Sequence, residues 1–143
     1  MKFVDSHTLG GEGYQTTIAH TRSSSSSSRW DLVLEEELLA VWVTMTSFAA
    51  STVCVNPTAK LGAGIVTVFV FQRMSRWEMV QLLLSIDTGD HINHPKVKRY
   101  PCSEYLLEPL TEQGIFALDG ERIEYGPVHG GMLAGMANFL SLK

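Results

Sequence analysis

The residues of this chain whose types and spacing could support chemistry include two histidines near its middle. His91 and His94 stand three residues apart in the sequence HINHP, which could suggest a metal site. Zinc sites take three or four protein ligands, and no third ligand lies at nearby spacing. We therefore interpret both histidines as solvated loop residues and expect no bound metal.

A second candidate is the pair of carboxylates around Gly120 in IFALDGERIEYGP, Ile115–Pro127. Apolar residues run up to Asp119-Gly120, and apolar residues alternate with charged ones beyond it. This pattern predicts a β-hairpin, because Asp and Gly tolerate the positive φ that a two-residue turn requires. Such a turn needs no ligand to explain it, so the residues alone leave a purely structural role open.

A third candidate, LGGEG at Leu9–Gly13, has the glycines of a phosphate-binding loop. That loop needs a preceding strand and a following Lys-Ser or Lys-Thr pair, and neither is visible here. We interpret it as an ordinary loop.

Length and charge limit the function classes. The chain has 143 residues, enough for one domain, a net charge of -4 and 11 Lys and Arg without a long basic run, so nucleic-acid binding is disfavoured. Cys54 and Cys102 fit neither a disulfide framework nor a CxxC metal site, and the N-terminus lacks the order of a signal peptide. We expect a cytoplasmic protein.

The first 28 residues show no sustained helical or strand period and end in the serine run Ser23–Ser28. We predict a disordered tail over 1–28 and a single domain over 29–143. In that domain Glu35–Glu37 is interpreted as a solvated turn or helix start.

The middle of the chain reads as β. Leu38–Val55 is 18 residues without a charge, close to the minimum for crossing a bilayer. Its Ser and Thr residues among β-branched and aromatic ones favour buried strands instead. Ile65–Phe71 (IVTVFVF) has almost nothing polar on either face and predicts a strand that is buried on both sides.

One helix is well marked at about 75–88. Ser75 and Glu78 form a capping box, and Gly89 suits a left-handed C-terminal cap. An apolar stripe follows helical spacing and consists of Met79, Leu82, Leu83 and Ile86. Trp77, Val80 and Leu84 widen the apolar surface, so the helix is predicted either to be enclosed in a core or to line an apolar site.

Two patterns describe the C-terminal part. Pro101 interrupts the strand-like Val97–Pro109, which predicts an edge strand, a bulge or two short strands. In the segment Gly126–Lys143 several apolar residues are spaced as in a short amphipathic helix: Met132, Leu133, Met136, Phe139 and Leu140. The predicted class is mainly β with one helix.

The order of these motifs resembles that of sphingosine kinases and the wider diacylglycerol-kinase-like lipid kinases. The resemblance covers roughly Leu38–Leu140 and rests on NPTAKLGAG, the Ser-Arg helix, HPKV, and LEPLTEQGIFALDGERIEYGP at Leu107–Pro127. Ala63 stands where the family has Asp. The family's N-terminal lobe, with its Gly-Gly-Asp-Gly phosphate loop and its catalytic Asp, has no counterpart.

The resemblance implies a β-sandwich-like C-terminal lobe of an enzyme that uses ATP and Mg²⁺ to phosphorylate a sphingoid base. It implies that Asp119, Gly120 and Glu121 contact the nucleotide and that Met79, Leu82, Leu83 and Ile86 line a lipid pocket. It assigns no catalytic residue to this chain, which is expected to be inactive alone, with peripheral membrane association as an option.

Two alternatives remain open: a non-catalytic fragment that binds a lipid or a partner, and an incomplete copy of the gene.

Overall fold

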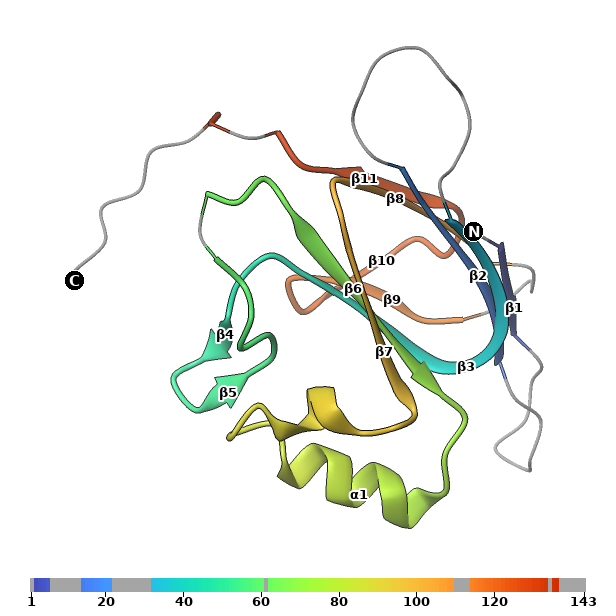
Figure 1. Ribbon diagram of the computed structural model, residues 1–143. Coiled ribbons are helices and arrows are strands. Elements are labelled where there is room, and N and C mark those ends of the chain that lie inside the picture. The colour runs from blue at the N-terminus through green and yellow to red at the C-terminus, as the bar shows by residue number, and fades with distance from the viewer. Residues whose placement is uncertain are drawn as a thin grey trace.

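The computed structural model describes residues 2–5, 14–21, 32–60, 62–109, 114–133 and 135–136. These residues form a seven-stranded sheet, two small hairpin sheets and one α-helix (Figure 1). The predicted class, mainly β with one helix, is confirmed.

The large sheet has the strand order β11-β8-β1-β2-β3-β6-β7. Its strands are antiparallel except for the short parallel pairing of β1 with β8. They span β1 Lys2–Asp5, β2 Tyr14–Thr21, β3 Leu32–Thr44, β6 Val66–Gln72, β7 Val97–Cys102, β8 Glu104–Pro109 and β11 Val128–Gly131. The small sheets pair β4 Phe48–Ala50 with β5 Val53–Cys54, and β9 Phe116–Leu118 with β10 Glu121–Ile123. α1 covers Arg76–Leu84, and a 3-10 helix, η1, covers Asp90–Asn93.

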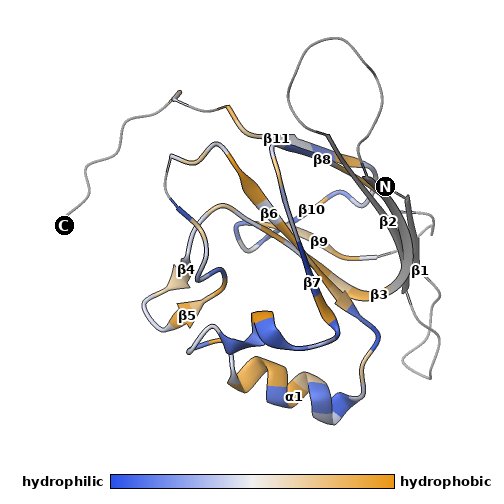
Figure 2. Ribbon diagram, in the orientation of Figure 1, coloured by the Kyte–Doolittle hydropathy of each residue, from blue (hydrophilic) through white to orange (hydrophobic). Residues whose placement is uncertain are grey.

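β6 forms the centre of the core, as its continuous apolar run predicts. Its residues from Val66 to Phe71 are all buried. Val66, Val68 and Val70 pack on one side of the strand with Leu38 and Leu107. Phe69 and Phe71 pack on the other side, the one that α1 covers. Figure 2 shows the hydrophobic residues that run along β6 and β3.

β3 contains one extra residue relative to its partner β6. Leu38 pairs with Gln72 and Ala40 with Phe71, so the register shifts between them as a β-bulge. Before the bulge, Leu38 belongs to the cluster of valines; after it, Val41 and Val43 belong there. Trp42 lies on the opposite side, with its ring 4.5 Å from that of Phe71.

Two predictions for the N-terminal third are wrong. Disorder was expected over 1–28, yet β1 and β2 lie in this range, and β2 pairs with both β3 and β8. The run Ser23–Ser28 lies outside the described residues. Glu35–Glu37 is no turn or helix start, because β3 runs through it. Both errors arise because pairing between distant strands overrides a weak local pattern.

The interrupted stretch Val97–Pro109 forms two strands, as one of the predicted options had it. Pro101 lies in β7, the edge strand beside β6. One side of an edge strand forms no hydrogen bonds within the sheet, so a residue without an N–H is tolerated there. The predicted C-terminal helix is absent from the described residues, where β11 pairs with β8 and Leu133 and Met136 are exposed. The positions 139 and 140 lie outside the description.

Candidate functional site

The N-terminal end of α1 is fixed by the predicted capping box. The Ser75 hydroxyl accepts a hydrogen bond from the Glu78 N–H at 3.2 Å, and the Ser75 N–H donates to Glu78 Oε2 at 2.7 Å. Each bond satisfies a backbone N–H group that would have no partner at an uncapped helix start. The helix begins where the sequence predicts it.

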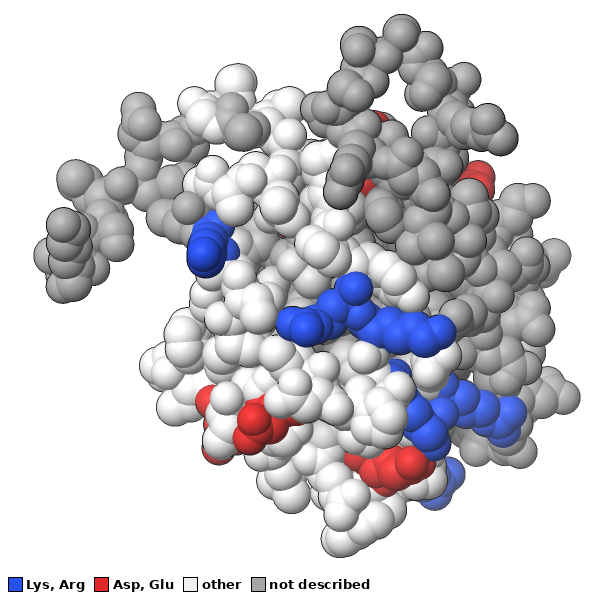
Figure 3. All heavy atoms as spheres, in the orientation of Figure 1, with Lys and Arg blue, Asp and Glu red and all other residues white. Residues whose placement is uncertain are grey.

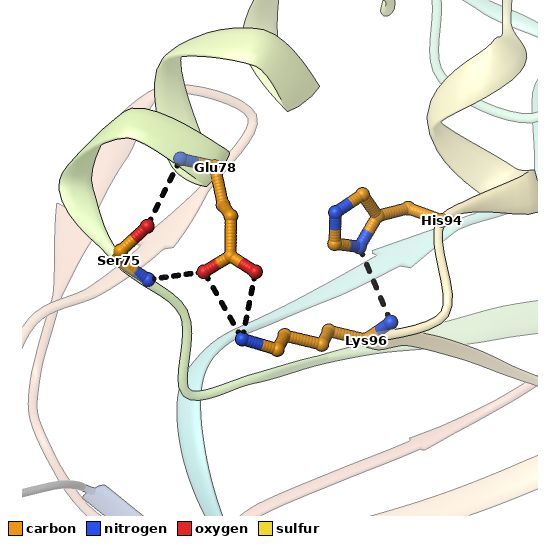
Figure 4. A network of polar contacts seen from close by, with 4 residues as sticks. All are labelled: Ser75, Glu78, His94 and Lys96. Atoms are coloured by element: carbon orange, nitrogen blue, oxygen red, sulfur yellow. Dashed lines mark hydrogen bonds and ion pairs between the residues drawn. The ribbon is translucent and has the colours of Figure 1, made fainter.

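Lys96, just before β7, ties the start of α1 to the sheet. Its ammonium lies 2.9 Å and 3.0 Å from the two carboxylate oxygens of Glu78. Its backbone N–H donates to His94 Nδ1 at 3.2 Å (Figure 4). The bond to Lys96 and those to Ser75 lower the pKa of Glu78 from 4.5 to about 2. Glu78 is therefore charged throughout the physiological range and holds both partners.

The predicted lipid-lining stripe divides into two pairs in the structure. Leu82 and Ile86 are buried, and Leu82 packs with Phe69 in the core beneath the helix. Met79 is half-buried, and Leu83 keeps 51% of its surface exposed. The first pair is explained by ordinary core packing, whereas the second remains accessible to a ligand.

The turn that follows α1 is held by β5. The Cys54 N–H donates to the Ile86 carbonyl at 3.1 Å. Gly89 has the left-handed φ of 77° that the sequence predicts, but it is the N-terminal cap of η1; α1 ends at Leu84, and its C-terminal cap is Ser85. A Cβ at Gly89 would lie 3.1 Å from Pro57 Cγ, so both conformation and space favour glycine.

His91 is buried, contrary to its interpretation as a solvated loop residue. Only 1% of its surface is exposed, its ring lies near those of Trp42 and Phe69, and Nε2 donates to the Val55 carbonyl at 3.1 Å. Nδ1 has no partner among the described residues. Burial lowers the pKa of His91, which keeps the ring neutral. Sequence reasoning missed this burial because the rings that lie beside His91, those of Trp42 and Phe69, belong to β3 and β6, which are distant in the sequence.

Asn56, at the start of the NPTAKLGAG stretch, is another buried polar residue that sequence reasoning missed. None of its surface is exposed. Its amide nitrogen donates to Thr67 Oγ1 at 3.0 Å, and its carbonyl oxygen accepts from the Thr58 N–H and hydroxyl at 3.3 Å and 2.8 Å. One side chain thus fixes the loop to β6.

The hairpin at the other candidate site forms as predicted. Leu118 pairs with Glu121 across the two-residue turn, in which Asp119 and Gly120 have φ values of 50° and 89°. Asp119, Gly120 and Glu121 are all exposed. The side chains of Asp119 and Glu121 form no hydrogen bond with any other residue that the structure describes.

These two candidate sites are not brought together. In Figure 1 the turn between β9 and β10 lies apart from α1. The described residues contain no group of three or more His, Cys, Asp or Glu side chains arranged to hold a metal ion. Within the same part of the chain, no helix is long and apolar enough to cross a membrane.

The sequence pattern of the YegS C-terminal NAD kinase beta sandwich-like domain matches residues 26–140. Human sphingosine kinase 2 is 27% identical over 113 residues, which cover 77% of this chain and 17% of the relative. Human sphingosine kinase 1 is 28% identical over 106 residues, with coverages of 72% and 28%. A diacylglycerol kinase from Staphylococcus carnosus is 31% identical over 111 residues, with coverages of 78% and 33%.

The chain therefore spans a third or less of these relatives. The resemblance drawn from the motifs, to sphingosine and diacylglycerol kinases, is confirmed over most of the chain.

Proposed function

The chain belongs to the family of YegS C-terminal, NAD kinase beta sandwich-like domains, and we propose that it is the lipid-binding lobe of a sphingosine kinase. In the complete enzyme, the γ-phosphate of ATP passes to the primary hydroxyl of a sphingoid base. The observation that carries this proposal is the half-open apolar surface of α1 in a domain related to lipid kinases.

The lipid part of the site is built from α1. Met79 and Leu83 form its accessible surface, and the buried Leu82 and Ile86 hold this surface on the core beneath. An alkyl chain that leaves water for such a surface gains about 0.8 kcal/mol per buried methylene. A few contacts of this kind suffice to hold a long-chain base, and the clamp between Glu78 and Lys96 keeps the helix in place against the sheet.

The nucleotide part of the site is the exposed turn of the β9–β10 hairpin. Carboxylates accept hydrogen bonds, so Asp119 and Glu121 suit the hydroxyls of a ribose or the amino group of adenine. Nothing lies within 4 Å of a Cβ built at Gly120, so a ligand can approach the backbone there.

The carboxylates of Asp119 and Glu121 do not fit a triphosphate, because without a metal ion they would repel its negative charges. ATP arrives with Mg²⁺, which usually takes one or two carboxylates besides phosphate oxygens and water. No residue of the described part of the chain is assigned to the phosphates, to the metal or to the removal of the hydroxyl proton. The chain is therefore expected to bind and orient but not to catalyse.

The first test is the activity of the purified chain with ATP, Mg²⁺ and sphingosine. We expect no phosphate transfer, because phosphoryl transfer depends on positioned metal, backbone amides and a base. Sphingosine 1-phosphate formed by the chain alone would contradict a half-site.

The second test places the chain in human sphingosine kinase 1, in exchange for the region that it matches. We expect this chimaera to phosphorylate sphingosine in preference to diacylglycerol. In the chimaera, Asp119→Asn or Glu121→Gln should raise KM for ATP by about threefold to tenfold, the cost of one hydrogen bond. The exposed Glu124, just beyond β10, provides the matched control Glu124→Gln. Unchanged ATP dependence in both turn variants would return the turn to a structural role.

A second candidate function is a lipid-binding module without catalysis. It is favoured by the same accessible pair, Met79 and Leu83, which needs no nucleotide. Tight binding of sphingosine by the chain, together with a chimaera that binds lipid but transfers no phosphate, would support it over the kinase.

A further inference from the structure

α1 has a second apolar surface, which faces away from the sheet. At 100° per residue, Trp77, Val80 and Leu84 fall within an arc of about 60°, roughly opposite the buried Leu82. Their exposed fractions are 69%, 44% and 74%. We call these three residues the outer face of α1. No described element packs on it, and it is distinct from the edge formed by Met79 and Leu83.

Basic residues lie beside one end of this face although the chain as a whole is acidic. Residues 73–99 carry five of the 11 Lys and Arg residues and three of the 15 Asp and Glu residues. Arg73 and Arg76 are exposed at the N-terminal end of α1, and Arg99 is exposed on β7. In Figure 3, Lys and Arg gather over β7 and beside the start of α1, and the lowest part of the view, formed by α1, is uncharged.

The negative charges nearby are weakly placed to oppose an anionic partner. Glu78 is neutralised by the ammonium of Lys96 at 2.9 Å. Asp87 and Asp90 follow the C-terminal end of the helix, away from Arg76. The outer face therefore combines an apolar strip with a positive border at one end.

The size of the face indicates what kind of partner fits it. A nine-residue helix is about 14 Å long. A stable protein interface buries about 800 Å² on each partner, and three side chains of at most about 250 Å² each fall short of that. A short helix with Trp and Leu on one side and basic residues at its border suits the headgroup region of a bilayer, where Trp is enriched.

We propose that the outer face of α1 is a docking site for the surface of an anionic membrane. Trp77, Val80 and Leu84 enter the headgroup region, and Arg76 pairs with a lipid phosphate. The inference rests on exposure and charge and does not require kinase activity.

The test measures co-sedimentation of the full chain with vesicles of phosphatidylcholine alone and of phosphatidylcholine with phosphatidylserine. We expect binding to the anionic vesicles that weakens as salt is added. Trp77→Ser and Leu84→Ser should each weaken it by about tenfold or more, since each removes a large apolar side chain from the contact. Arg76→Gln should weaken it by about fivefold, the effect of one basic residue near a charged bilayer.

Matched controls lie on the hairpin, where Leu118 is 63% exposed and Arg122 is exposed. Leu118→Ser and Arg122→Gln should bind as the unmodified chain does. In a second readout, the emission of Trp77, obtained by difference from Trp77→Phe, should shift to shorter wavelength on anionic vesicles. Thermal unfolding of each variant checks that it remains folded.

Three results would overturn the proposal. The first is equal vesicle binding by Trp77→Ser, Leu84→Ser and the unmodified chain. The second is binding that does not distinguish anionic from neutral vesicles. The third is self-association of the chain that Trp77→Ser abolishes without any vesicle binding, which would make the outer face an interface between two copies.

Discussion

The neighbouring leucines Leu82 and Leu83 provide a direct test of which part of α1 is core and which part binds lipid. Leu82 is 2% exposed and packs with Phe69, Phe71 and Val97. Leu82→Ala should lower the free energy of unfolding by about 3 kcal/mol, within the range of about 2–5 for a buried leucine. Leu83 is 51% exposed, so Leu83→Ala should change that free energy by no more than about 0.5 kcal/mol.

The effects on lipid binding should be reversed. Covering the exposed half of Leu83 with an alkyl chain is worth about 1 kcal/mol, half of a full leucine burial. Leu83→Ala should therefore weaken sphingosine binding by about fivefold without destabilising the fold. Leu118→Ala, on the hairpin, changes a leucine that is 63% exposed and lies away from α1, and it should change neither quantity.

Two assays separate the outcomes. Urea unfolding, followed by far-ultraviolet circular dichroism, gives the stability of each variant. Tryptophan fluorescence during titration with sphingosine gives the affinity of each folded variant. Equal destabilisation by the two substitutions would refute the burial argument, and unchanged sphingosine affinity in Leu83→Ala would refute the placement of the lipid on this helix.

Two further predictions concern polar groups. The pKa of Glu78 lies below its ordinary value, so the stability that it contributes is present above about pH 4.5 and is lost as the pH falls towards 2. In Lys96→Met that pKa should rise and the acid-induced loss should become smaller, as urea unfolding between these pH values will measure; an unchanged pH dependence would contradict the pairing. Asn56→Ala removes three hydrogen bonds, to Thr58 twice and Thr67 once, and should cost about 3 kcal/mol in the same assay at neutral pH, whereas a loss below about 1 kcal/mol would show that the loop is held by other contacts.

The elements that depend only on residues close together in the sequence were predicted correctly. The capping box at Ser75 needs only residues within one turn of helix, and the turn at Asp119-Gly120 needs only two residues that accept positive φ. The continuous apolar run of β6 reports its burial directly, because few other environments accept such a sequence. For these elements, sequence and structure agree nearly to the residue.

The remaining errors depend on which segments meet in space. No residue near His91 in the sequence indicates that it will lie beside Trp42 and Phe69, which belong to β3 and β6. The apolar residues of α1 surround most of the helix, so only the position of the sheet decides that Leu82 points inward and Leu83 outward. The site residues could be nominated from the sequence, but their division into core and accessible surface could not.

The extra residue in β3 has a consequence for insertions and deletions. Side chains alternate between the two faces of a regular strand, so a one-residue change there reverses every residue beyond it. Deleting Leu39 would make Leu38 and Ala40 neighbours opposite the neighbouring residues Gln72 and Phe71, which removes the bulge and keeps Trp42 against Phe71. Inserting a residue after Ala40 would instead turn Trp42 away from Phe71 and Val43 towards α1, so β3 should tolerate the loss of its extra residue better than a further insertion.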